Sequence, residues 1–257
     1  MWRKTNLIWE NLYSLKEAEV ILLGIPFDST CTEIPGARFA PNRIREAFQT
    51  HISCYDKELG DLSEVKIHDA GNLEAMHGNI QGMHKLIYDS VKEILEENPK
   101  ARLIILGGEH SITYPIVKAL AEKKKFNYLC YDGHLDLWNE NQGIKLSHEC
   151  VNRRVFELFG NIEIRGARSD EKENFDFARK LRPVKDPLYL SIDTDVLENV
   201  PVQCPAAGGM KIEELWAGIK KRKIIACDVV EYNPLIGETM IVPELVKKLI
   251  LKLSKTK

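Results

Sequence analysis

Apolar residues along this chain alternate between short continuous runs and longer stretches with helical periodicity. The short runs are rich in isoleucine, leucine, valine and tyrosine, and each of them predicts a β-strand. Because most of these runs are apolar without interruption, we expect strands covered on both faces, as in a parallel sheet. The predicted strands are Glu19–Leu23, Val65–Asp69, Arg102–Leu106, Asn127–Tyr131, Ile162–Arg165, Pro187–Ile192 and Lys223–Val229.

Helical periodicity occupies the stretches between these strands. Near residues 84–97 one face of a predicted helix carries Leu86, Ile87, Val91, Ile94 and Leu95. Further helices are expected at about 112–124, 149–159, 170–181, 211–221 and 240–254. Ser169 precedes Asp170 and Glu171, which is typical of an N-cap followed by acids in the first turn.

The regular alternation of strands and helices contains no linker, repeat or low-complexity tract. It predicts a three-layer α/β/α fold with a mainly parallel sheet. A chain of 257 residues is long enough for a substantial core, and we expect a single domain over residues 1–257.

Composition excludes several classes of partner. The net charge of −2 suggests neither nucleic acid nor an anionic membrane as a partner. The apolar runs are too short to span a bilayer, and Met1-Trp2-Arg3-Lys4 leads into no signal sequence. The six cysteines show no metal-ligand or redox spacing, and we expect Cys130 and Cys227, inside strand runs, to be buried free thiols. These features favour the cytoplasm.

Acidic and imidazole side chains follow three of the predicted strands. The clusters are Gly107-Gly108-Glu109-His110, Asp132-Gly133-His134-Leu135-Asp136 and Asp193-Thr194-Asp195. A lone Asp-x-Asp at a strand end is usually a turn or a helix cap, and a lone histidine is usually a satisfied core residue. Three such clusters are harder to explain in this way. The carboxyl ends of parallel strands share one edge of the sheet, where ligands bind, so the three clusters can meet in one site.

The spacing within the clusters points to metal. In extended chain Asp193 and Asp195 would project from one strand face, about 6–7 Å apart, as would the alternate residues from Asp132 to Asp136. Like charges so close are unfavourable unless a cation neutralises them. The candidate ligands are His110, Asp132, His134, Asp136, Asp193 and Asp195. This oxygen-rich set suits Mn²⁺, Mg²⁺ or Fe²⁺, and six ligands fit two ions about 3.5–4 Å apart, which predicts a binuclear metallohydrolase.

The order of these motifs resembles the ureohydrolase family of arginases and agmatinases. The resemblance covers nearly the whole chain and includes an opening segment with Pro26-Phe27-Asp28 and a later segment with Gly166-Ala167-Arg168-Ser169. Its motifs are Gly107-Gly108-Glu109-His110-Ser111, Asp132 to Asp136, Ser191-Ile192-Asp193-Thr194-Asp195 and Asp228-Val229-Val230-Glu231. The family fold has the same α/β/α architecture with about eight strands.

The resemblance implies roles for the candidate ligands. Asp132 and Asp193 would bridge two Mn²⁺ ions. His110 and Asp136 would complete one ion's site, and His134 and Asp195 the other's. A hydroxide held between the ions would attack the guanidinium carbon of the substrate, with Asp136 placed to receive its proton.

Two further residues carry expected catalytic and substrate-binding roles. His148 matches the position of the family's general acid or proton shuttle, although a histidine before a helix is in isolation more often a polar cap. Glu231 would pair with the guanidinium of the substrate. His51, His68, His77 and His84 match no motif, and we expect them on the surface.

Three departures from the family pattern concern the substrate pocket. After Asp195 the family usually continues with Asp-Pro and a Pro-Gly-Thr-Gly loop, whereas residues 196–209 form a shorter stretch without the Thr-Gly. Gly133 stands where the family commonly has alanine, and Glu149 where many agmatinases have glycine.

The stretch from Leu137 to Ser147 resembles archaeal agmatinases and lacks the loop with which arginases hold an amino acid. The expected reaction is hydrolysis of agmatine to putrescine and urea, a step of polyamine biosynthesis. Aminopropylagmatine, guanidinobutyrate and arginine stay open as substrates, as do formimino or acyl-amine hydrolysis and an inactive regulatory role. The resemblance implies a homo-oligomer, a trimer or hexamer, although the sequence alone does not fix the oligomeric state.

Overall fold

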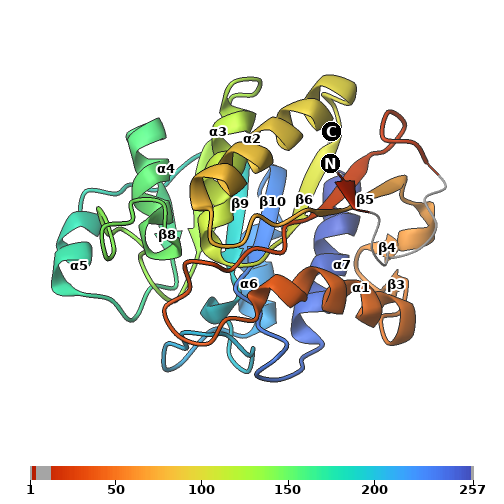
Figure 1. Ribbon diagram of the computed structural model, residues 1–257. Coiled ribbons are helices and arrows are strands. Elements are labelled where there is room, and N and C mark those ends of the chain that lie inside the picture. Colours follow the sequence, from red (N-terminus) through yellow and green to blue (C-terminus); the bar gives the residue numbers. More distant parts are fainter. Residues whose placement is uncertain (1, 4–12, 256–257) are drawn as a thin grey trace.

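The computed structural model describes residues 2–3 and 13–255, and within them eight strands form one central sheet (Figure 1). The strand order is β1-β5-β2-β6-β10-β9-β7-β8. Only β1 runs antiparallel to its neighbour, so the sheet is mainly parallel as expected. The strands are β1 Trp2–Arg3, β2 Val20–Gly24, β5 Ile67–Leu73, β6 Arg102–Leu106, β7 Asn127–Tyr131, β8 Glu163–Arg165, β9 Leu188–Asp193 and β10 Ile224–Val230.

Helices cover both faces of the sheet and complete the expected three layers (Figure 1). The helices are α1 Ala40–Thr50, α2 Ile80–Glu97, α3 Thr113–Ala121, α4 Val151–Phe159, α5 Lys172–Ala178, α6 Ile212–Ile219 and α7 Ile241–Ser254. Short 3₁₀ turns are η1 Ala37–Phe39, η2 Leu62–Glu64, η3 His110–Ile112, η4 His148–Cys150 and η5 Thr194–Val196. A small hairpin, β3 Tyr55–Asp56 and β4 Gly60–Asp61, lies apart from the main sheet.

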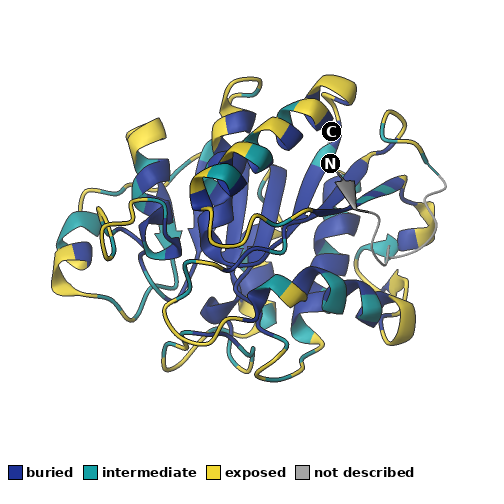
Figure 2. Cartoon of the chain, viewed as in Figure 1, coloured by how far each residue is buried: buried dark blue, intermediate teal, exposed yellow. Residues whose placement is uncertain are grey.

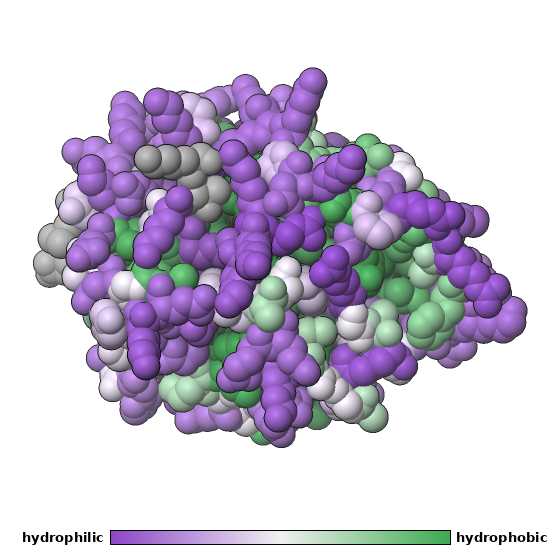
Figure 3. All heavy atoms as spheres, turned by 180° about the vertical axis from the view of Figure 1, so that it is seen from behind, coloured by the Kyte–Doolittle hydropathy of each residue, from purple (hydrophilic) through white to green (hydrophobic). Residues whose placement is uncertain are grey.

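Alternate residues of the strands feed two apolar cores. In β6, Ile104 and Leu106 pack beneath α1, α6 and α7, whereas Leu103 and Ile105 pack beneath α2, α3 and α4. The strands are therefore buried on both faces, and exposed residues lie on the outer faces of helices and on loops (Figure 2). The face opposite to the view of Figure 1 carries mostly hydrophilic side chains (Figure 3). No helix in the described part of the chain is long and apolar enough to cross a membrane.

The register of the inner strands places their carboxyl ends at one edge of the sheet. Leu106 at the end of β6 pairs with Val229 of β10, and Val230 pairs with Asp193 at the end of β9. On the other side of β9, Ile192 pairs with Tyr131, the last residue of β7. All segments that carry the candidate ligands therefore leave the sheet side by side.

All seven predicted strands and all six predicted helices are present, but three local expectations were wrong. Helix α1 was not predicted. Ser169 caps no helix: the N-cap of α5 is Glu171, which makes no side-chain cap hydrogen bond. Instead the Ser169 N–H donates to the Gly133 carbonyl at 3.2 Å and belongs to the loop packed against the site.

His84 is buried instead of lying on the surface. It is 7% exposed on the inner face of α2, because it falls in helical register with Ile80 and Ile87. Its ring lies 6.2 Å from that of Tyr114, and burial lowers its pKa to about 4. His51 and His77 are exposed as expected.

Candidate metal centre and substrate pocket

A pocket with a volume of about 450 Å³ opens at the carboxyl edge of the sheet. Its floor contains metal-ligand candidates, and its wall contains His148 and Glu231. The lining residues are His134, Asp136, Trp138, Glu140, Asn141, Gln142, His148, Glu149, Ser169, Asp170, Glu171, Asp193, Asp195, Val202, Gln203, Cys204 and Glu231.

The structure brings the six candidate ligands together in two overlapping groups. In the first, donor atoms of His110, Asp132, Asp136 and Asp193 all lie within 4.8 Å of one another. In the second, Asp132, His134 and Asp195 do the same. Asp132 is common to both groups and so occupies the position between two potential ion sites.

The carboxylates converge through tight turns and not, as expected, from one face of extended strands. Asp132 follows the end of β7, and the chain then bends so sharply that Asp136 has a positive φ of 50°. Asp193 ends β9, but Asp195 already lies in the turn η5, where its N–H donates to Asp193 Oδ1 at 2.9 Å. A short polar side chain tolerates these turns, and the backbone N–H groups inside them hold the carboxylates in place.

At two glycines of the site, neighbouring atoms lie so close to the backbone that a side chain would not fit. A Cβ on Gly133 would lie 2.9 Å from Asp195 Oδ1, the atom to which the Gly133 N–H donates at 2.6 Å. A Cβ on Gly108 would lie 2.0 Å from the Phe27 carbonyl oxygen. The missing side chain lets the two backbones approach, and the Glu109 N–H donates to that same Phe27 carbonyl at 2.8 Å. The Gly108 carbonyl in turn accepts from the Glu231 N–H at 2.8 Å. The loops that follow β2, β6 and β10 are thereby locked together.

The imidazole of His110 is oriented by groups behind the site. Its Nε2 lies 3.0 Å from Ser191 Oγ, and the single proton of that hydroxyl is donated to Asp228 Oδ1 at 2.6 Å. Ser191 can therefore only accept, which places the imidazole proton on Nε2. Nδ1 faces Asp136 Oδ2 at 2.9 Å and Asp132 Oδ2 at 3.3 Å, so in the neutral imidazole it is the atom that would ligate a cation together with these carboxylates.

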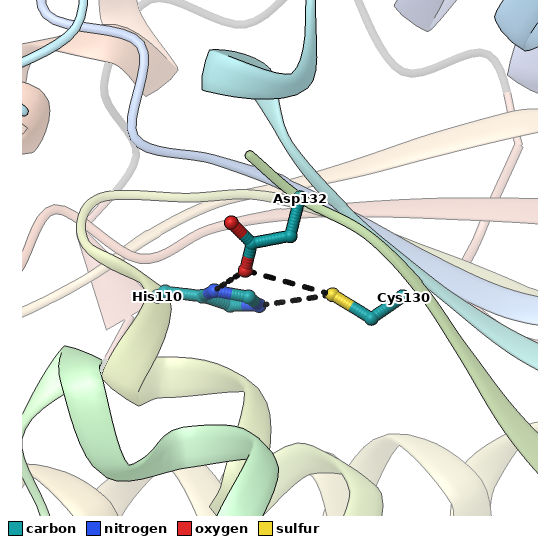
Figure 4. Close-up of side chains that lie close together, drawn as sticks. All are labelled: His110, Cys130 and Asp132. Carbon is teal, nitrogen blue, oxygen red and sulfur yellow. Dashed lines mark hydrogen bonds and ion pairs between the residues drawn. The ribbon is translucent and has the colours of Figure 1, made fainter. Parts of the chain in front are cut away.

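Cys130 lies beside His110 and Asp132 at the back of this site (Figure 4). Its Sγ is 3.8 Å from His110 Nε2 and 3.9 Å from Asp132 Oδ2. Burial raises the pKa of the Cys130 thiol to about 11, so the thiol is protonated when no metal is bound. Cys130 and Cys227 are both buried and free, which confirms that expectation.

The electrostatics of the floor favour a bound cation. Burial, together with Asp136 and Asp195, raises the pKa of Asp132 to about 7. Burial and the neighbouring carboxylates also raise the pKa of Asp193 well above its ordinary value. Ionised carboxylates this deep are costly without compensating positive charge, and divalent ions supply it. The donor set, carboxylate oxygens with two imidazole nitrogens, fits such ions.

Glu231 and His148 form the wall of the pocket. Glu231 follows β10 with a positive φ of 67°, and its Oε1 accepts from the His110 N–H at 2.7 Å. Burial raises the pKa of Glu231 to about 7. Burial alone would lower the pKa of His148, but the surrounding carboxylates, Glu231 first among them, outweigh it and raise the pKa. Strained backbone of this kind, at Glu231 and Asp136, is typical of functional sites.

The shortened loop over residues 196–209 borders the pocket, as the sequence indicated. Arg168 tethers this loop near both ends, because its Nη2 donates to the Asp195 carbonyl at 2.6 Å and to the Ala206 carbonyl at 3.0 Å. Gln203, which the sequence did not single out, is buried and donates from Nε2 to Glu231 Oε2 at 3.2 Å. In the sequence, only its position in the loop that differs from the family pattern could have indicated a role for Gln203.

Comparison with known proteins agrees with this geometry. The model of the arginase family matches residues 18–184 and 177–254. An agmatinase of Pyrococcus horikoshii is 37% identical over 248 residues, covering 85% of each chain. An N(1)-aminopropylagmatine ureohydrolase of Thermococcus kodakarensis is 36% identical, over 84% of this chain and 83% of the relative. The crystal structure of the agmatine ureohydrolase of Thermoplasma volcanium superposes with a TM-score of 0.83 at 26% identity, over 98% of this chain and 95% of that one.

Fold and pocket thus define an enzyme, a hydrolase that acts on guanidino compounds. The chain belongs to the arginase family, and its similarity to archaeal agmatinases is the resemblance that the motifs indicated.

Proposed function

We propose that the protein hydrolyses the guanidinium C–N bond of agmatine, releasing putrescine and urea, with two Mn²⁺ ions in the pocket floor. The observation that carries this proposal is the meeting of two overlapping donor groups, through Asp132, beneath a wall formed by Glu231 and His148. The relatives named agmatinase support the choice of substrate.

Asp132 and Asp193 would contact both ions, with His110 and Asp136 completing one ion's site and His134 and Asp195 the other's. When bound, two divalent ions supply positive charge that makes water acidic enough to act as a nucleophile near neutral pH. Asp136, which lines the pocket, would hold the proton that this water loses.

Glu231 would orient the substrate. Glu231 lines the pocket, and each of its oxygens accepts one hydrogen bond from the protein, from the His110 N–H and from Gln203, so that acceptor capacity is left for a substrate. A guanidinium offers paired N–H groups that match a carboxylate, and its positive charge favours the ionised form of Glu231. The pair would hold the planar carbon above the pocket floor, ready for attack.

His148 would protonate the departing amine. The C–N bond breaks as the amine nitrogen takes up a proton, so an acid that is protonated near neutral pH must lie at the pocket wall. The raised pKa of His148 meets this requirement.

Aminopropylagmatine is a second candidate substrate. Glu140 and Glu171 are exposed at the outer rim of the pocket, and Glu149 lies half-buried between the rim and His148. These carboxylates could pair with the additional amino group of a longer substrate, which the similarity to the Thermococcus kodakarensis relative also favours.

We further propose that the protein works in the cytoplasm and as a homo-oligomer. All six cysteines are free, which supports a reducing compartment. The family resemblance supports the oligomer.

Urea release from a panel of guanidino compounds tests the function. With Mn²⁺ present, we expect agmatine or aminopropylagmatine to be turned over well, arginine poorly, and formimino and acyl-amine compounds not at all. Glu231→Gln keeps the shape of the side chain and removes its charge, so kcat/KM should fall while metal content and folding persist. Glu198→Gln, outside the pocket lining, is the matched control. Turnover of an acyl-amine with a harmless Glu231→Gln would overturn the proposal.

A further inference from the structure

The hydroxyl of Thr30 lies between a fully buried carboxylate and the imidazole of His148. Its Oγ1 is 2.6 Å from Glu109 Oε1, 3.1 Å from the backbone nitrogen of His148 and 3.5 Å from His148 Nδ1. Glu109 and His148 are both buried, and Thr30 is half-buried. The three residues come from three separate segments of the chain, and each contact is therefore a feature of the folded site.

Hydrogen-bond donors surround Glu109. Thr30 donates its N–H to Oε2 at 2.8 Å and its hydroxyl to Oε1, and the hydroxyl of Ser111 also donates to Oε1 at 2.6 Å. Three donors on two oxygens is the arrangement that an acceptor carboxylate requires. The short distance commits the only proton of the Thr30 hydroxyl to Glu109.

With its proton committed, Thr30 Oγ1 can only accept hydrogen bonds from His148. One lone pair takes the His148 backbone N–H, and the other faces Nδ1. A bare Nδ1 there would set two acceptors against each other, so the contact favours a proton on Nδ1. In neutral His148 this leaves Nε2 bare, as the nitrogen that gains and loses the catalytic proton. Glu149 Oε1 lies 3.7 Å from this Nε2.

We propose that Thr30 is a positioning residue that, held by Glu109, fixes His148 as the Nδ1–H tautomer and presents Nε2 for proton transfer. The arrangement repeats that of His110, where Ser191, held by Asp228, fixes the opposite tautomer. The kinetic consequence of this inference rests on the proposed function, but the tautomer itself does not.

Two threonine variants and one control test the inference. Thr30→Val keeps the shape and removes the hydroxyl, and it should lower kcat for agmatine about 10–100-fold, as loss of outer hydrogen-bond partners does. KM and metal content should stay within about twofold, because Thr30 is not placed in contact with the substrate or with the metal ligands. Thr30→Ser restores the hydroxyl and should restore kcat. Ser111→Ala removes the other hydroxyl on Glu109 Oε1 without contacting His148, and should lower kcat at most about threefold.

Nitrogen-15 NMR of histidine-labelled protein reads the tautomer directly. The protein is loaded with diamagnetic Zn²⁺ and held at a pH above the raised pKa of His148, so that the imidazole is neutral. The His148 signals are assigned by their absence in His148→Asn. We expect the Nδ1–H tautomer in the parent and in Ser111→Ala, and an increased share of Nε2–H in Thr30→Val.

An Nε2–H tautomer in the parent protein, or an unchanged tautomer in Thr30→Val, would overturn the inference. Equal losses of kcat in Thr30→Val and Ser111→Ala would also overturn it, because both would then act through Glu109 alone. If no guanidino compound releases urea with the parent protein, the proposed function fails, and the NMR result decides the inference by itself.

Discussion

The floor of the pocket and its outer rim are built in different ways. At the floor, Asp132, which directly follows β7, and Asp228, within β10 behind the ligands, are wholly buried, and several protein groups hold each of them. At the rim, Glu140 and Glu171 are exposed on loops. The floor is therefore fixed by the register of the sheet, whereas the rim can change with loop length and sequence. The fold therefore places the groups that carry out the reaction on the sheet and the groups that select the substrate on the loops.

Glu149 and Gln203 lie at the boundary between the two regions. Both come from segments that depart from the family pattern, yet Gln203 contacts Glu231, and Glu149 lies beside His148. A change in the rim can therefore reach the catalytic groups through these two side chains. Variants of floor and boundary residues should separate their contributions.

The largest effect is expected on the floor. Asp132→Asn removes the carboxylate common to both donor groups, so metal content should fall from about two ions per chain toward none, with loss of activity. Asp193→Asn should behave similarly, whereas His110→Asn, which touches one ion, should lose less metal. Elemental analysis of the dialysed protein measures this, and Cys130→Ala, beside the ligands, is the control that should keep its metal.

An intact metal content in Asp132→Asn would contradict the central position of this residue. Loss of metal in Cys130→Ala would show that the floor is built differently from the proposal.

A smaller effect is expected at the pocket wall. His148→Asn should lower kcat about 10²–10⁴-fold, the usual contribution of a general acid, and leave metal content intact. Added imidazole should restore part of the rate by entering the space left behind. Steady-state kinetics with and without imidazole measure this, and full activity in the variant would remove His148 from the mechanism.

The smallest effect is expected at the boundary, as a shift in pH dependence. A general acid must be protonated, so kcat should fall as the pH rises through the raised pKa of His148. Glu149→Gln removes one of the negative charges that raise this pKa, so the descending limb of the profile should move to lower pH. Glu173→Gln, exposed on α5, is the control and should not move it.

A limb that moves to higher pH in Glu149→Gln would show that Glu149 does not stabilise the protonated imidazole. The boundary would then contribute packing and not charge.

Much of the fold could be predicted because strands such as Arg102–Leu106 are continuous apolar runs, and both bounds of β6 and β7 were correct. The clustering of the ligands followed from one rule, that parallel strands end at a common edge. Helix α1 was missed although the sequence carries signals for it, namely Pro41 in its first turn and an apolar face with Ile44, Ala47 and Phe48. Organisation as one domain over residues 1–257 stays a prediction.

The supporting groups could not be predicted, because their contacts span the chain. Thr30 and His148 are 118 residues apart, and Gln203 and Glu231 are 28 apart on different loops. Periodicity and motif spacing describe neighbours along the chain, and they say nothing of which distant loops meet. The sharp turns of Asp136 and Asp195 were likewise hidden, since alternating residues look the same in a strand and in a turn.

A titration of metal-free protein with Mn²⁺ tests the central claim most directly. Bound Mn²⁺ and urea release from agmatine are measured on the same samples. The account predicts that urea release reaches its maximum only when about two ions are bound per chain, because both donor groups must be filled. Full activity with one tightly held Zn²⁺ and no second ion would contradict it.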